Sequence, residues 1–454
     1  MNFKRIIGLL GFATLLPLAV FAQSRTVTLQ EALKLALENN QNIAVSRYEK
    51  QVGEQQIIQT RARALPQVSG TGNFTDNYKR QVLVLPPGTF GSASDKPSTI
   101  TAGTLYSASF GVDASQALID PAVFTALKAV KASRDFYQLN TKLTEEEVIN
   151  RTAQAYYGIL ASRELIAVQD SNISRLTQLI TAAEGQYKAG LARRIDLDRI
   201  RVNLTNAQTV RLRQQNQIAS QTNDLKVLMG VSIETEIEPA NISLREIEEK
   251  VGSYMPTENF DLKNRTEMRV LEEQITLAGM QAKAIRAENY PRLSAFVNYS
   301  GNVVGDNFGD FFKSGGQDVG YGYGSFGLRL NVPIFDGFAR QARTQQALLQ
   351  GMELSKRREA TELSLTADFR NARFQMANSI NAIAAQKENA QLAKSVYLAS
   401  QSNYNLGLAT LTDLLDAQSS FIQAQLSFTQ SLLDYKIAEL ESTRAAGNLR
   451  SLLQ

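Results

Sequence analysis

The pattern of hydrophobic and polar residues along the chain switches between a helical and a strand period. Residues 28–64 follow a helical pattern that stops before Pro66, and Thr28 and Glu31 have the spacing of a capping box at its start. From residue 67 every second position is polar, which is the pattern of a strand with one wet face. This first stretch therefore predicts one helix followed by a strand.

The strand pattern occurs in two pairs. The first pair covers residues 67–78 and 106–114, and residues 82–85 in the loop between them could extend a strand. The second pair lies around residues 293–302 and 325–332, on either side of a glycine-rich loop. Each pair predicts a β-hairpin with one apolar and one polar face.

Two long helical stretches follow these hairpins. Residues 122–189 continue without proline for about 68 residues, which is roughly 100 Å at the rise of an α-helix. Residues 338–403 form the second stretch. Helices of this length indicate coiled-coil packing rather than a compact domain. Return helices are expected over residues 195–229, where Gly230 ends the first, and after residue 413.

A short motif links each long helix to its return helix. Tyrosine, two residues, Gly-Leu-Ala, three residues and aspartate run from Tyr187 to Asp196, and again from Tyr404 to Asp413. A glycine in this place can adopt the left-handed conformation that ends a helix, so each copy is interpreted as the tip of a helical hairpin. The strand-to-helix joints at residues 109–121 and 325–337 match as well. The chain is therefore a duplicated unit.

The duplication suggests a division of the chain into segments. Residues 1–22 have the basic start, the apolar run and the small residues of a signal peptide, with cleavage before Gln23. Residues 23–240 form the first repeat, residues 241–260 form a connector interpreted as irregular, and residues 261–454 form the second repeat. No later segment has the 18 apolar residues of a membrane-spanning helix.

Composition narrows the functional classes. The 454 residues carry a formal net charge of +4 and contain no Cys, His or Trp. Without thiol or imidazole, the usual nucleophiles, bases and zinc ligands are missing, so we expect no enzyme, no metal site and no cofactor; carboxylate chemistry alone stays open. The mild charge does not indicate nucleic-acid binding.

Four strands with one apolar face cannot close a barrel in a membrane, where open sheet edges are not tolerated. Several copies must therefore pool their strands, and three copies would provide twelve. The alternative is a soluble sheet packed on one side. The expected fold is mainly α with a β-barrel, and it consists of two structural repeats of long antiparallel coiled-coil helices and β-hairpins.

The chain resembles the outer-membrane factor family, the TolC-like channels of tripartite efflux systems. The residues that carry the resemblance are the two Gly-Leu-Ala tips, Pro66, Pro291 and the segment from Pro333 to Gly337. The resemblance implies a homotrimer in outer-membrane lipid: a trimeric α-barrel tunnel in the periplasm with a shared 12-stranded outer-membrane β-barrel. It also implies a passive conduit for efflux or type I secretion that docks to a periplasmic adaptor (a membrane fusion protein) and an inner-membrane pump. The missing lipidated cysteine predicts a non-lipidated member.

The tips are the expected functional sites. The adaptor-docking residues are Gly190, Leu191, Ala192, Gly407, Leu408 and Ala409. The resemblance places a gate, formed where the three copies meet, at Asp196, Tyr404, Asp413 and Asp416, to which we add Tyr187, Arg193 and Arg194. An inward aspartate would form an acidic ring that favours cations. The alternative is an aspartate that simply stabilises a helix start.

The gate departs from the family pattern at one position. The best-known channel has an arginine two residues after the second tip glycine, where this chain has Ala409. Arg193 or Arg194 is expected to replace it by pairing with Asp413 or Asp416. The competing interpretation of the whole chain is a periplasmic coiled-coil adaptor or structural protein without its own channel. The duplicated long hairpin argues against that interpretation.

Overall fold

The computed structural model describes residues 25–87, 97–190, 192–240, 244–253, 260–309 and 319–453. The expected signal peptide and Leu191 lie outside the described residues, as does part of the connector. The described chain forms two compact units, and each takes segments from both halves of the sequence. We call residues 25–43, 145–260 and 368–453 the hairpin unit, and residues 44–144 and 261–367 the sheet unit.

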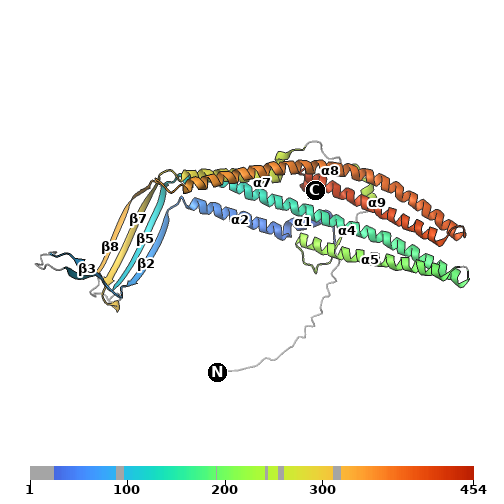
Figure 1. The fold of residues 1–454 in the computed structure, drawn as a ribbon, viewed down its shortest axis with the longest axis horizontal. Helices are drawn as coiled ribbons and strands as arrows, with labels where there is room; N and C mark the ends of the chain where they lie inside the picture. The colour runs from blue at the N-terminus through green and yellow to red at the C-terminus, as the bar shows by residue number, and fades with distance from the viewer. Residues whose placement is uncertain are drawn as a thin grey trace, which may run out of the picture. The chain divides into compact units, whose positions relative to one another are not determined.

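Two helical hairpins dominate the hairpin unit (Figure 1). The first joins α4 (Val130–Lys188) to α5 (Arg194–Met229), and the second joins α8 (Ala339–Asn405) to α9 (Leu411–Ala445). The expected long helices are thus present. The first is interrupted once, at Ala129, which separates a short α3 (Pro121–Lys128) from α4.

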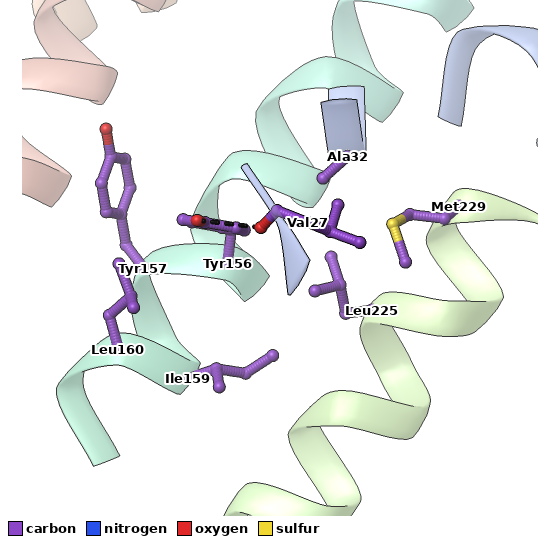
Figure 2. Close-up of a cluster of buried hydrophobic side chains, with 8 residues drawn as sticks. All are labelled: Val27, Ala32, Tyr156, Tyr157, Ile159, Leu160, Leu225 and Met229. Atoms are coloured by element: carbon purple, nitrogen blue, oxygen red, sulfur yellow. Dashed lines mark hydrogen bonds between the residues drawn. The ribbon is translucent and has the colours of Figure 1, made fainter. Parts of the chain in front are cut away.

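A small parallel sheet anchors the start of the chain. Here β1 (Arg25–Val27) pairs with β6 (Ile237–Pro239), and the Tyr156 hydroxyl donates to the carbonyls of Val27, at 3.2 Å, and Ala240, at 3.1 Å. Figure 2 shows Val27 and Tyr156 in a buried cluster with side chains of α1, α4 and α5. The connector is more regular than expected, since it contains α6 (Leu244–Glu249).

The single helix expected over residues 28–64 is wrong, because Asn40 divides it into α1 (Leu29–Asn39) and α2 (Gln41–Ala62). The Asn40 side-chain oxygen accepts hydrogen bonds from the backbone of Asn42 (2.9 Å) and Ile43 (3.3 Å). Its Nδ2 donates to the carbonyl of Leu228 at 2.7 Å. The expected capping box of Thr28 and Glu31 is present at the start of α1.

An antiparallel sheet forms the core of the sheet unit (Figure 1). Its four strands lie in the order β2 (Gln67–Asp76), β5 (Tyr106–Ile119), β7 (Arg292–Gly305) and β8 (Val319–Asn331). A separate pair, β3 (Gln81–Leu85) with β4 (Ser98–Ala102), extends the connection between β2 and β5, so residues 82–85 do form a strand.

The register of the sheet places most of the apolar residues of the four strands on one face, whereas Phe296, Tyr321 and Tyr323 lie on the other. Val112 lies opposite Tyr299, Ala114 opposite Val297, and Val297 opposite Phe326. The exposed members of this apolar face are Val68, Phe74, Phe110, Val112, Val297, Tyr299, Phe326, Leu328 and Leu330. Serine, threonine and asparagine dominate the other face, as the alternation predicts.

Glycines let the aromatic rings of the apolar face lie flat on the neighbouring strands. A Cβ atom at Gly301 would lie 2.5 Å from the ring of Phe110, and one at Gly322 would lie 2.8 Å from the Tyr299 hydroxyl. The remaining elements are the 3₁₀ turn η2 (Leu262–Asn264), α7 (Thr266–Ala287) and the 3₁₀ turn η4 (Leu449–Leu453). Within the described residues, none of the helices has the length and hydropathy of a membrane span.

Candidate functional site: the helical tips

The first tip turns at Gly190, which has φ of 74°. Its N–H donates to the carbonyl of Tyr187 at 3.0 Å, just after α4 ends. The left-handed conformation predicted for this glycine is therefore present. Arg193 then begins α5 from an extended backbone conformation.

The second tip has the same geometry. Gly407 has φ of 77°, its N–H donates to the carbonyl of Tyr404 at 3.0 Å, and the N–H of Leu408 donates to the carbonyl of Asn403 at 2.8 Å. These two bonds satisfy carbonyls that the end of α8 would otherwise leave open. The side chain of Leu408 is 76% exposed, so the turn presents an apolar residue to its surroundings.

Asp413 closes a capping box at the start of α9. Its carboxylate accepts from the N–H of Thr410 at 3.0 Å and from the Thr410 hydroxyl at 2.7 Å, while the hydroxyl accepts from the N–H of Asp413 at 3.2 Å. The hydrogen bond from the Thr410 hydroxyl is the largest cause that lowers the pKa of Asp413. The aspartate of the second tip thus has a structural role within its own chain.

Asp196, the equivalent residue of the first tip, has a different partner. Arg193 donates to its carboxylate through Nε at 3.0 Å and through a second guanidinium nitrogen at 3.2 Å. This bidentate contact is the main reason that the pKa of Asp196 is lowered. Threonine caps the helix in one tip, and arginine pairs with the carboxylate in the other.

The expected latch is not formed within the chain. Arg193 pairs with Asp196, and Arg194 lies 3.8 Å from the carboxylate of Asp198. In the part of the chain that the structure describes, neither arginine contacts Asp413 or Asp416. Asp416 is exposed and has no hydrogen bond or ion pair there.

The two tyrosines of the motif lie in different environments. Tyr404 packs against the buried residues of both hairpins, among them Leu411 and Leu414. Burial raises its pKa, and the nearby charge of Asp196 adds to that effect. Tyr187 is exposed. The structure therefore brings Tyr404 and Asp196 together, whereas Tyr187 contributes a backbone carbonyl to the turn.

Contacts between the two hairpins involve residues that the motif did not indicate. Arg199 of α5 donates to the hydroxyl of Thr412 at the start of α9, at 3.0 Å. Within the first hairpin, Arg201 of α5 pairs with Glu184 of α4 at 2.9 Å. Arg199 occupies the first-repeat position that corresponds to Asp416, so aligning the repeats would have shown opposite charges at equivalent places.

Above the tips, the hairpins are joined by a mixed aromatic and polar layer. Tyr397 of α8 stacks on Phe421 of α9 with ring centroids 5.6 Å apart, and the Arg175 guanidinium lies 5.3 Å from the Phe421 ring centroid. Buried Gln418 donates to Asn172 at 2.8 Å. In the described ranges no group of three or more acidic side chains is arranged so that it could hold a metal ion. The site is thus a set of caps and interhelical contacts.

Comparison with known proteins shows the family to which the chain belongs. The sequence model of the family described as "Outer membrane efflux protein" matches residues 32–231 and 261–448. A probable efflux pump outer membrane protein of Pseudomonas putida, TtgC, is 23% identical over 92% of this chain and 82% of its own length. The alkaline protease secretion protein AprF of Pseudomonas aeruginosa is 23% identical over 90% and 82%, and Escherichia coli TolC is 20% identical over 98% and 85%.

Solved structures share the fold. The outer membrane protein VceC of Vibrio cholerae superimposes with a TM-score of 0.72 at 16% identity, covering 92% of this chain and 96% of VceC. The CmeC outer membrane channel of Campylobacter jejuni gives 0.70 at 17% identity, covering 92% and 85%. The family match and the fold together define an outer-membrane channel of the TolC type. The chain belongs to the outer membrane efflux protein family, whose members are channels rather than enzymes.

Proposed function

We propose that three copies of the chain form one outer-membrane channel that receives cargo from a periplasmic adaptor and an inner-membrane pump. The observation that carries this proposal is the continuous apolar face across the four strands, in a sheet whose edges are β2 and β8. In lipid, open edges leave backbone groups without hydrogen-bond partners, at a cost of several kcal/mol for each group. Joining β8 of one copy to β2 of the next in a ring of three satisfies both edges with twelve strands.

The tips are the proposed adaptor-docking surface. Leu406 and Leu408 are exposed around Gly407, and Ile195 is exposed beside the first tip. Exposed apolar side chains on a turn held by a left-handed glycine suit packing against another helical protein. The relatives named for efflux and for protease secretion support the same conduit in either an efflux or a type I secretion system.

Asp416 is the proposed selectivity residue of the gate. The Asp413 carboxylate is hydrogen-bonded to Thr410, and the Asp196 carboxylate is hydrogen-bonded to Arg193. Asp416, in contrast, is exposed one helical turn further along α9. Three copies would place three such carboxylates around the axis, and a ring of this kind favours cations. Arg193 and Arg194, already bound to carboxylates of their own helix, would have to exchange partners to act as a latch between hairpins.

The test combines mass and conductance. Native mass spectrometry of the detergent-purified protein should give three times the chain mass, and the same preparation should form discrete conducting units in planar bilayers. A monomer that stays folded in detergent, or trimers without conductance under any applied potential, would contradict the proposal.

The division into repeats at residues 23–240 and 261–454, with a connector at 241–260, stays a prediction from the sequence.

A further inference from the structure

The joint between β8 and α8 borders an open hollow that the channel function does not explain. It has a volume of about 560 Å³ and lies between the end of α7 and the first turns of α8. Arginine and aromatic side chains share its lining: Arg286, Tyr290, Phe335, Phe338 and Arg340. All of these residues belong to the sheet unit.

One of the arginines around the hollow has no ion-pair partner within the described residues. Arg340 is 8% exposed, and it donates to the Asp336 carboxylate at 2.7 Å and to the carbonyl of Glu288 at 3.2 Å. Arg343 pairs with the Glu288 carboxylate at 2.8 Å. Arg286 is exposed, and within the described residues its guanidinium has no hydrogen bond or ion pair. The lining therefore has a local excess of one positive charge, on Arg286.

The rim of the hollow is apolar although it is exposed. Ile334 is 92% exposed and Phe335 73%, and the rings of Phe335 and Phe338 meet edge to face with centroids 5.5 Å apart. Phe338 has φ of 66°, a left-handed conformation that is rare for a bulky residue. The equivalent first-repeat joint has Pro121 and Ala122 where this one has Gly337 and Phe338. The strained aromatic pair thus belongs to the second joint.

This joint continues the apolar face of the sheet. Leu328 and Leu330 lie on that face, β8 ends at Asn331, and Ile334 and Phe335 follow directly. If the sheet crosses the membrane, its helical end lies where hydrocarbon gives way to headgroups. Aromatic side chains concentrate at that level, and a guanidinium binds phosphate strongly.

We propose that the hollow binds the headgroup of an anionic phospholipid. Arg286 contacts the phosphate, and the acyl chains lie along Ile334 and Phe335 toward the apolar face of the sheet. This inference rests on the proposed function, because it requires the sheet to face lipid. It gives Phe338 a role, since the left-handed turn holds a ring at the rim instead of in a core.

The absence of tryptophan from the chain makes a direct test possible. In Phe335→Trp the single indole reports on the hollow. The trimer is reconstituted into vesicles in which either the phosphatidylglycerol or the phosphatidylcholine carries bromine on its acyl chains, at equal mole fraction. Brominated phosphatidylglycerol should quench the indole at least twofold more strongly than brominated phosphatidylcholine.

Removal of the charge should abolish that preference. Arg286→Gln in the Phe335→Trp background should make the two lipids quench equally. Arg357→Gln removes the same charge from an exposed position further along α8 and should leave the preference unchanged. Millimolar inorganic phosphate should not reverse the preference, because the acyl chains hold the lipid at the rim.

Two results would overturn the inference. If both brominated lipids quenched the indole equally while Arg286 is intact, the joint would contact lipid through its apolar side chains alone, without a preference for an anionic headgroup. Quenching by acrylamide in water but by neither lipid would mean that the hollow faces the lumen or a neighbouring copy. Native mass and conductance of the same Phe335→Trp protein separate these results from a failure of the channel proposal, since both should equal those of the unaltered protein.

Discussion

At the scale of single residues, the two tip aspartates show how one motif serves two purposes. Asp413 and Asp196 occupy the same position in their repeats, three residues after the N-cap residue of the return helix. Thr410 provides a side-chain cap, whereas Arg193 does not and instead binds the carboxylate. The shared spacing therefore reflects helix capping, and the charge available to the channel comes from other carboxylates.

This difference predicts unequal effects of equivalent substitutions. Thr410→Ala should destabilise the first turn of α9 by about 1 kcal/mol, the usual loss for an N-cap hydroxyl. Arg193→Ala, at the matching position of α5, should cost less because it removes an exposed ion pair. Hydrogen–deuterium exchange of the two helix starts measures both. Equal acceleration in the two variants would contradict the capping assignment.

Asp416 provides a second prediction at this scale. Asp416→Asn should reduce the cation selectivity of single channels, because it removes a carboxylate with no partner in the described structure. Asp413→Asn should change selectivity less and should mainly loosen α9. Reversal potentials in a salt gradient measure the cation selectivity of each variant. The acidic-ring hypothesis fails if both variants keep the original selectivity.

At the scale of secondary-structure elements, the sequence predicts most of the fold because the local rules agree. Pro66 and Pro291 end helices, alternation marks β2, β5, β7 and β8, and the tip glycines adopt the expected conformation. The failures involve partners that are distant in sequence. Asn40 interrupts a helix while its amide binds Leu228, and the three residues of β6 form a strand only because β1 lies beside them.

The candidate site was harder to predict for the same reason. The motif located both tips and their glycines correctly, yet it could not show that Arg193 would pair with Asp196 in its own helix turn. The contact of Arg199 with Thr412 depends on how two hairpins pack, which no local spacing records. Whether the named residues form the gate stays a prediction about the assembled channel.

A prediction at the scale of secondary-structure elements concerns the glycine of the second tip. Gly407→Val should strain the second tip by more than 1 kcal/mol, because a β-branched residue at φ of 77° clashes with its own backbone. Gly407→Asn is the matched control, since asparagine tolerates that conformation better. Complementation of a deletion strain, at equal amounts of trimer, compares the two. Full activity of Gly407→Val would argue against docking at this tip.

At the scale of the whole molecule, the absence of cysteine allows a direct test of how copies join. Ser69→Cys on β2 can be combined in turn with Ser325→Cys, Gly327→Cys or Arg329→Cys on β8. One register should give a disulfide-linked species of three chains on non-reducing gels. Asp113→Cys on the central strand β5 is the control, because both of its neighbours lie in the same chain. If the protein has the mass of a trimer but none of the three cysteine pairs forms a cross-link, the shared barrel would be contradicted.

The two open sheet edges also have a genetic consequence. A chain whose β2 edge is blocked still presents an intact β8 edge, so it can enter a ring that it cannot complete. When blocked and normal chains are expressed equally and mix at random, about one in eight trimers contains normal chains alone. An allele of this kind should therefore be dominant, and it should lower channel activity far below the half expected for loss of one gene copy.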